Sequence, residues 1–336
     1  MHSKVAGYAL DAINSLTSTQ LSFIQSLPKA ELHAHLNGSI PISVLRELAK
    51  ESSVSSEAIS KLQNGVELNE IHDFFGLFPA IYSMTATPEA LGRVTRAVLA
   101  EFLDGDTPQC TYLELRSTPK ETPAMTRMEY VKTVLDEVEK YRKDQAAFIV
   151  SAGREMDEES VKECFGIAKT LKAEGRRVVG VDLCGDPLRG DVDMFCRHLA
   201  DAKSAGLGVT LHIAETKDNP HPETLKLLSI GPDRLGHATF LNNEAQSIVL
   251  KEKIAVELCL SSNLLCKTVG SLDVHHIRDY LKHDHPIAIC TDDILPFRNS
   301  MLGEYALLMA SAPLGLGLSD DDVRRIAEMS MKCRFT

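Results

Sequence analysis

Seven side chains that bind metals or transfer protons stand near the ends of apolar, β-rich segments. His33 and His35 close the first segment, and alternate side chains of a strand share one face, so both imidazoles can hold one zinc ion. Later segments carry His212 with Glu215, then His237, then Asp292 with Asp293. Three histidines and a carboxylate would form a zinc shell with room for a water molecule, which leaves three groups for proton transfer.

Each of these features is weak when taken alone. A His-x-His pair occurs often by chance, and an Asp-Asp pair after a strand often caps a helix. Their shared position at the ends of successive segments favours one metal site. The sequence has no H-E-x-x-H motif and no H-x-E with P-C-x-x-C, which argues against those protease sites and against a cytidine-deaminase-type fold.

Eight β-rich segments alternate with helix-like segments along the chain. The β-rich segments are 29–35, 111–117, 147–153, 178–184, 208–214, 233–239, 254–260 and 286–292. Several of the segments between them have apolar spacing near 3.6 or end in glycine, as α-helices do. Eight β-α units predict a closed (β/α)8 TIM barrel, with an open doubly wound sheet as the alternative. Active sites of such barrels lie at the C-terminal strand ends, where the seven side chains fall.

The segment 36–110 is too long for one connection, and we expect a helical insertion there, after the first strand. Phe74, Phe78 and Tyr82 are spaced four residues apart, on one helical face. This stripe is either ordinary core or an apolar lid over the barrel mouth. Residues 1–25 are expected to form an N-terminal helical segment before a single catalytic domain over 26–336.

Composition limits the class of protein. The formal net charge is −11, which argues against a nucleic-acid partner. No run of 18 apolar residues is present, so we expect no membrane partner. The N-terminus is a poor signal peptide, and the eight cysteines form no C-x-x-C pair. We therefore expect a cytoplasmic protein with reduced core cysteines, and a monomer.

Five motifs resemble those of the adenosine deaminase superfamily, in order and in spacing. They are LPKAELHAHLNGSI (27–40), LHIAE (211–215), DRLGHAT (233–239), ELCLSSN (257–263) and CTDD (290–293). The resemblance implies a (β/α)8 barrel of the metal-dependent hydrolase type with one catalytic zinc ion per chain. Carried onto matching positions, the zinc ligands would be His33, His35, His212 and Asp292.

The resemblance also implies a role for each remaining group. Glu215 would donate a proton to purine N1, which requires a raised pKa. His237 would orient or deprotonate the water, whose pKa zinc lowers to about 7. Asp293 would hold the attacking hydroxyl group and face the ring N7. The backbone N–H of Gly185 would meet the base, although this residue alone would be a simple turn glycine.

Asn37 separates three kinds of purine substrate. Enzymes of free adenosine resemble H-x-H-L-Asp here and fungal-type adenine deaminases H-x-H-L-Glu, whereas HLNGSI resembles the adenosine-deaminase-like branch that handles N6-methyl-AMP. A carboxylate would repel a 5′-phosphate, and an amide can donate a hydrogen bond to it. The turn of Ser117, Thr118, Pro119 and Lys120 would grip the phosphate, unless it is only a polar turn with a solvated lysine.

The expected reaction is therefore zinc-dependent hydrolysis of N6-methyl-AMP, or a related N6-substituted AMP, to IMP and an alkylamine. The expected substrate contacts are His35, Asn37, Tyr82, Ser117, Thr118, Pro119, Lys120, Gly153, Gly185 and Asp293. Three alternatives stay open: an adenosine or adenine deaminase, a two-metal hydrolase with a bridging lysine, and a non-catalytic relative that binds purine nucleotides. The branch usually has histidine at the position of Tyr82, and CRFT ends the sequence short of the family's last helix, so we expect a short C-terminus.

Overall fold

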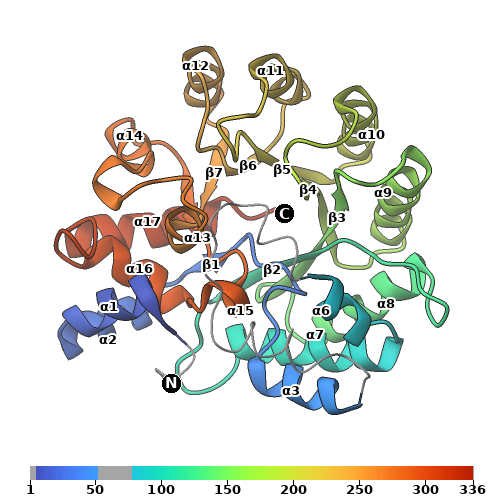
Figure 1. Ribbon diagram of the computed structural model, residues 1–336, viewed down its shortest axis with the longest axis horizontal. Coiled ribbons are helices and arrows are strands. Elements are labelled where there is room, and N and C mark those ends of the chain that lie inside the picture. Colours follow the sequence, from blue (N-terminus) through green and yellow to red (C-terminus); the bar gives the residue numbers. More distant parts are fainter. Residues whose placement is uncertain (1–4, 52–77, 336) are drawn as a thin grey trace.

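The computed structural model describes residues 5–51 and 78–335. Within them, eight parallel strands follow one another in chain order and form a nearly closed barrel, surrounded by helices (Figure 1). The strands are β1 (Ala30–Glu31), β2 (Tyr112–Ser117), β3 (Ala146–Gly153), β4 (Val178–Cys184), β5 (Gly208–Ile213), β6 (Arg234–His237), β7 (Ala255–Leu258) and β8 (Ile287–Ile289). The predicted (β/α)8 barrel is confirmed, and the open sheet is excluded.

Most of the helices after β2 cover the outside of the barrel, because an amphipathic helix buries its apolar face against the strands. In chain order they are α8 (Arg127–Val138), α9 (Glu158–Ala173), α10 (Val192–Ser204), α11 (His221–Ser229), α12 (Asn243–Glu252), α13 (Leu260–Leu265), α14 (Ile277–Lys282), α15 (Ile294–Phe297), α16 (Met301–Met309) and α17 (Asp320–Lys332), with a 3-10 turn η2 (Leu272–Val274). Side-chain caps mark several starts: Asp157 accepts from the Ser160 N–H at the start of α9. No helix in 5–51 or 78–335 is long and apolar enough to cross a membrane.

The insertion after β1 is helical, as predicted. Its described helices are α3 (Ile42–Glu51), α6 (Phe78–Met84) and α7 (Pro88–Leu103), which lie together at one side of the barrel (Figure 1). Phe78 and Tyr82 lie on α6, while Phe74, the third member of the predicted stripe, lies outside the described residues. Ahead of β1, the helices α1 (Gly7–Ser15) and α2 (Ser18–Ser26) pack against α16.

The interior of the barrel holds a buried ionic network. Arg234 pairs with Glu114 and with Glu257, both at 2.6 Å. Glu257 also accepts from Arg116 at 2.7 Å. All four side chains are essentially buried, so each charge needs its partners to offset the loss of hydration. The network runs along the barrel axis, between its floor and the strand ends that carry the predicted site.

Phe335 closes the floor of the barrel. A Cβ atom at Gly180 or Gly208 would lie within 2.6 Å of its ring, so both glycines make room for it. The Arg234 guanidinium stacks 3.5 Å from the ring centroid, and the Phe335 N–H donates to Glu114 at 2.7 Å. The floor is thereby attached to the same ionic network that reaches the other end of the barrel.

Candidate active site and metal centre

All seven predicted side chains meet at the C-terminal mouth of the barrel. His33 and His35 follow β1, His212 lies near the end of β5, and His237 ends β6. Glu215 follows β5, and Asp292 with Asp293 follows β8. The backbone turns sharply where the strands end: His237 has φ of 60° and Asp292 has φ of 63°. Left-handed φ values are costly for residues other than glycine, and they are found where a site requires them.

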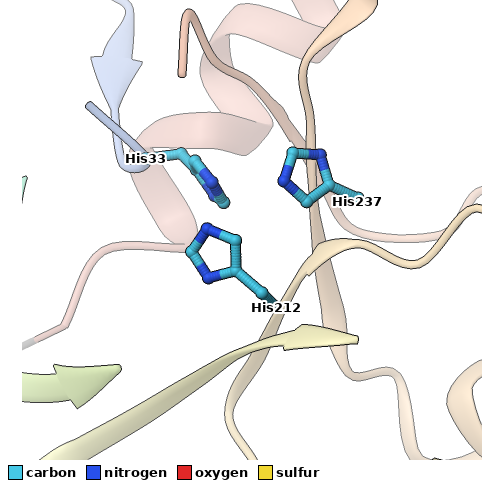
Figure 2. Close-up of side chains that lie close together, drawn as sticks. All are labelled: His33, His212 and His237. Carbon is cyan, nitrogen blue, oxygen red and sulfur yellow. The ribbon is translucent and has the colours of Figure 1, made fainter. Parts of the chain in front are cut away.

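Five side chains form a compact set of potential metal ligands. One ring nitrogen from each of His33, His212 and His237 lies within 4.8 Å of the other two. The same holds for one ligand atom from each of His33, His35 and Asp292. Figure 2 shows the imidazoles of His33, His212 and His237 turned toward one another. The Nε2 atoms of His35 and His212 are 3.1 Å apart. Asp292 Oδ1 lies 3.6 Å from His35 Nε2 and 3.8 Å from His33 Nε2.

The hydrogen bonds of these histidines fit a metal ion. His33 Nδ1 lies 2.6 Å from a Glu257 oxygen, and His212 Nδ1 lies 3.0 Å from an Asp182 oxygen. Because a carboxylate only accepts, both Nδ1 atoms carry the proton, and both Nε2 atoms present lone pairs to the cluster. His33 Nε2 is buried without a hydrogen-bond partner among the described residues. A shared cation would satisfy these facing lone pairs.

The pKa values of the two neighbouring aspartates are shifted in opposite directions. Burial alone would raise the pKa of Asp292, but the imidazole of His237, the largest of the opposing influences, holds it well below its usual value. Burial, and then the charge of Asp292, raise the pKa of Asp293 well above its usual value. These directions suit Asp292 to binding a cation as an anion, and they suit Asp293 to donating a hydrogen bond in its protonated form.

Burial also keeps two of the imidazoles uncharged. It lowers the pKa of His35 to about 3, helped by the neighbouring His212, and it lowers the pKa of His33 well below 6.5. Metal ligation requires the neutral imidazole, so these two rings are ready to bind at neutral pH.

Cys259 was predicted only as a core residue, yet its sulfur lies within 4.8 Å of ligand atoms of His237 and Asp292.

A cavity of about 340 Å³ opens in front of this cluster. Of the predicted residues it is lined by His35, Asn37, Tyr82, Ser117, Thr118, Lys120, Gly153, Gly185, His212, Glu215, His237, Asp292 and Asp293. His33 lies behind this wall, fully buried, and Pro119 is buried without lining the cavity. Phe78 and Tyr82 line it as well, as the lid interpretation of α6 required.

Asn37 is held in place by partners that the sequence did not indicate. Its Oδ1 accepts from the Tyr130 hydroxyl at 3.1 Å and from the Ser117 hydroxyl at 3.2 Å. Its amide nitrogen donates to Thr85 Oγ1 at 3.2 Å. Because an amide has two N–H bonds, one is left for a ligand. The Lys120 ammonium lies nearby at the rim, 4.6 Å from the centre of the Tyr82 ring.

The model of the family described as adenosine deaminase matches residues 28–336. The chain belongs to the adenosine deaminase family. N6-methyl-AMP deaminase of Bos taurus is 35% identical over 302 residues, 85% of each chain. N6-mAMP deaminase of Arabidopsis thaliana is 32% identical over 346 residues, 94% of each chain. Such relatives support a hydrolytic purine deaminase.

Solved structures of this family have the same architecture. Arabidopsis ADAL complexed with IMP gives a TM-score of 0.83 at 32% identity, with 94% of each chain covered. The same protein complexed with GMP gives the same TM-score. An adenine deaminase from Arthrobacter aurescens reaches a TM-score of 0.81 at only 20% identity, which shows a shared fold.

Two glycines of this deaminase fold matter for reasons that the sequence did not reveal. A Cβ atom at Gly38 would lie 1.3 Å from Asp293 Oδ1, so Asp293 keeps its place only beside a glycine. Gly185 has φ of 90°. The Glu155 carboxylate covers its open face, since a Cβ atom at Gly185 would lie 2.7 Å from Glu155 Oε2. The sequence predicts the purine at this position and gives no sign of Glu155.

Proposed function

We propose that this chain hydrolyses N6-methyl-AMP to IMP and methylamine with one bound zinc ion. The observation that carries the proposal is the cluster of His33, His35, His212 and Asp292, with Nε2 lone pairs facing one another at the barrel mouth. The names of the curated relatives and the IMP complex of an Arabidopsis relative support the substrate class.

Those four residues would hold the metal. Imidazole nitrogens and one carboxylate oxygen are the donors that zinc prefers, and a catalytic site leaves one position open. When bound, zinc supplies an activated water at neutral pH by lowering its pKa to about 7. Glu257 and Asp182 orient two of the ligand rings through their Nδ1 atoms.

Three other groups would handle protons and orient the base. Glu215 donates a proton to purine N1 as C6 is attacked, so the electron pair displaced from the C6–N1 double bond onto N1 is neutralised. His237 accepts the proton of the attacking water, and its Nε2 lies 3.5 Å from a Glu215 oxygen. Asp293 faces purine N7, which only accepts, and its raised pKa makes it the donor that N7 requires. The departing amine takes up the proton that His237 accepted as the bond from C6 to nitrogen breaks, and the proton of the new C6 hydroxyl passes to the Glu215 carboxylate as the product carbonyl forms.

The phosphate would lie against Asn37, Ser117, Thr118 and Lys120. Asn37 offers one N–H and Thr118 one O–H, while the Ser117 hydroxyl holds the Asn37 amide in place and the Lys120 ammonium supplies charge at the rim. Pro119 shapes the turn between them without facing the cavity. A 5′-hydroxyl needs no such cationic group, which favours a nucleotide over adenosine or adenine.

The test compares four substrates with the zinc-loaded protein: N6-methyl-AMP, AMP, N6-methyladenosine and adenosine, followed by chromatography, with zinc measured by mass spectrometry. We expect N6-methyl-AMP to yield IMP and both nucleosides to be nearly inert. Preference for adenosine would refute the phosphate assignment alone. A protein that binds no zinc, or that turns over none of the four, would refute the proposed reaction. Glu215→Gln should bind zinc normally and lose turnover.

A further inference from the structure

Glu155 extends back across two glycines into the wall of the substrate cavity. A Cβ atom at Gly153 would lie 2.5 Å from Glu155 Oε1, and one at Gly185 would lie 2.7 Å from Oε2. Both glycines therefore leave room for this carboxylate. Glu155 lines the cavity, and its side chain is 47% exposed, so a bound ligand can reach it.

The carboxylate keeps capacity to accept hydrogen bonds. Its ion pair with Lys120 spans 3.9 Å, which is longer than a hydrogen bond. An ionised carboxylate has about four lone-pair sites and no donor. The ligand group that fits in direct contact with it is therefore a neutral donor such as a hydroxyl, because a phosphate in contact with it would be repelled. The phosphate proposed against Asn37 and Thr118 would have the Lys120 ammonium between itself and Glu155.

The geometry of a purine nucleotide brings such a hydroxyl to this position. N3 lies across the six-membered ring from C6, so with C6 toward the metal centre N3 points toward the outer wall. In nucleic acids N3 and the ribose 2′-hydroxyl share one edge, the edge of the minor groove. A base whose N3 edge meets the Gly185 N–H therefore places its 2′-hydroxyl beside Glu155. Carboxylates recognise ribose hydroxyls in this way in dinucleotide-binding folds.

We propose that Glu155 accepts a hydrogen bond from the 2′-hydroxyl of the bound nucleotide and selects ribonucleotides against 2′-deoxyribonucleotides. The inference rests on the proposed function, because it uses the same orientation of the purine. It makes Glu155 a specificity-determining residue without a part in the chemical step.

The experiment compares kcat/KM for N6-methyl-AMP and its 2′-deoxy analogue in four proteins: wild type, Glu155→Ala, Glu155→Gln and Glu159→Ala. The last removes an exposed glutamate of α9 as a matched control. We expect the wild type and the control to prefer the ribonucleotide about tenfold or more. Glu155→Ala should reduce the preference to within about threefold by losing activity on the ribonucleotide alone. Glu155→Gln should keep part of it, since the amide oxygen still accepts.

Two results would overturn the inference: an unchanged preference in Glu155→Ala, or an equal loss on both substrates, which is the mark of a merely structural residue. Affinities for IMP and 2′-deoxy-IMP, measured by calorimetry, separate this inference from the proposed reaction. If N6-methyl-AMP is turned over and neither measurement distinguishes the two sugars, only the inference fails. If IMP binds more tightly than 2′-deoxy-IMP in the wild type and in Glu159→Ala but not in Glu155→Ala, and nothing is turned over, only the reaction fails. If neither nucleotide binds, both fail.

Discussion

Substituting Glu257 with glutamine should weaken the fold and the metal site together. The Glu257 carboxylate accepts from His33 Nδ1 at 2.6 Å, from Arg116 at 2.7 Å and from Arg234 at 2.6 Å. A glutamine of the same shape removes the charge and turns one acceptor into a donor, which would face an arginine or the imidazole. Breaking a buried ion pair costs about 3–5 kcal/mol, and losing an outer partner of a ligating histidine costs about 10–100-fold in metal affinity.

The matched control is Glu114→Gln, which alters the same ionic network on the far side of Arg234. Glu114 is equally buried and pairs with Arg234 at 2.6 Å. Two ion pairs, through Arg234, separate Glu114 from Glu257, and only Glu257 contacts His33. Both variants should therefore lose stability in urea unfolding, whereas only Glu257→Gln should lose zinc more readily to a competing chelator.

Zinc affinity and unfolding are measured on the same preparations at pH 7. If Glu114→Gln releases zinc as readily as Glu257→Gln, the loss of zinc follows from general destabilisation and the argument from His33 Nδ1 is wrong. The same conclusion holds if Glu257→Gln binds zinc with the affinity of the wild type.

Three further changes have directions that follow from the structure. Gly38→Ala places a Cβ atom 1.3 Å from Asp293 Oδ1, so turnover should fall about 100-fold or more while bound zinc, measured by mass spectrometry, stays near one per chain. Asn37→Asp should lower kcat/KM for N6-methyl-AMP by about 100-fold and spare adenosine, because like charges about 4 Å apart repel by about 4 kcal/mol before screening; an equal loss on both substrates would contradict this. Burial raises the pKa of Glu304 from 4.5 to about 7, so the folded state binds its proton more tightly than the unfolded state does. Its contribution to stability is full below pH 4.5 and falls by about 1.4 kcal/mol per pH unit as pH rises toward 7. Urea unfolding at pH 5, 6 and 7 should show a flatter decline for Glu304→Gln, and a parallel decline would refute the assignment.

The barrel could be predicted because its signals are local and repeated. Each β-rich segment predicted from the sequence overlaps one of the eight strands, with β3 beginning one residue earlier than its segment and β1 and β8 covering only two and three residues of theirs. The seven chemical side chains could also be placed together, because the C-terminal ends of parallel strands meet at one mouth whatever the exact register.

The residues that support the site were harder to find. Glu257 and Asp182 stand inside apolar segments. A carboxylate in a buried strand indicates an ionic partner inside the barrel, so the sequence could have pointed to both residues. Tyr130 offers no such signal, because its contact with Asn37 joins residues 93 positions apart through tertiary packing alone. Glu155 follows β3 directly, and only the three-dimensional position of two glycines shows that it faces the cavity.

The left-handed residues at the mouth of the barrel set a limit on how this protein can be improved. Ala214, His237, Ala238 and Asp292 all have φ between 47° and 63°. Each such residue costs of order 1–3 kcal/mol that a glycine would avoid. A stability-guided redesign unaware of the reaction would replace them first, and at His237 and Asp292 it would remove the chemistry. Selection for heat resistance and selection for turnover therefore pull these positions in opposite directions.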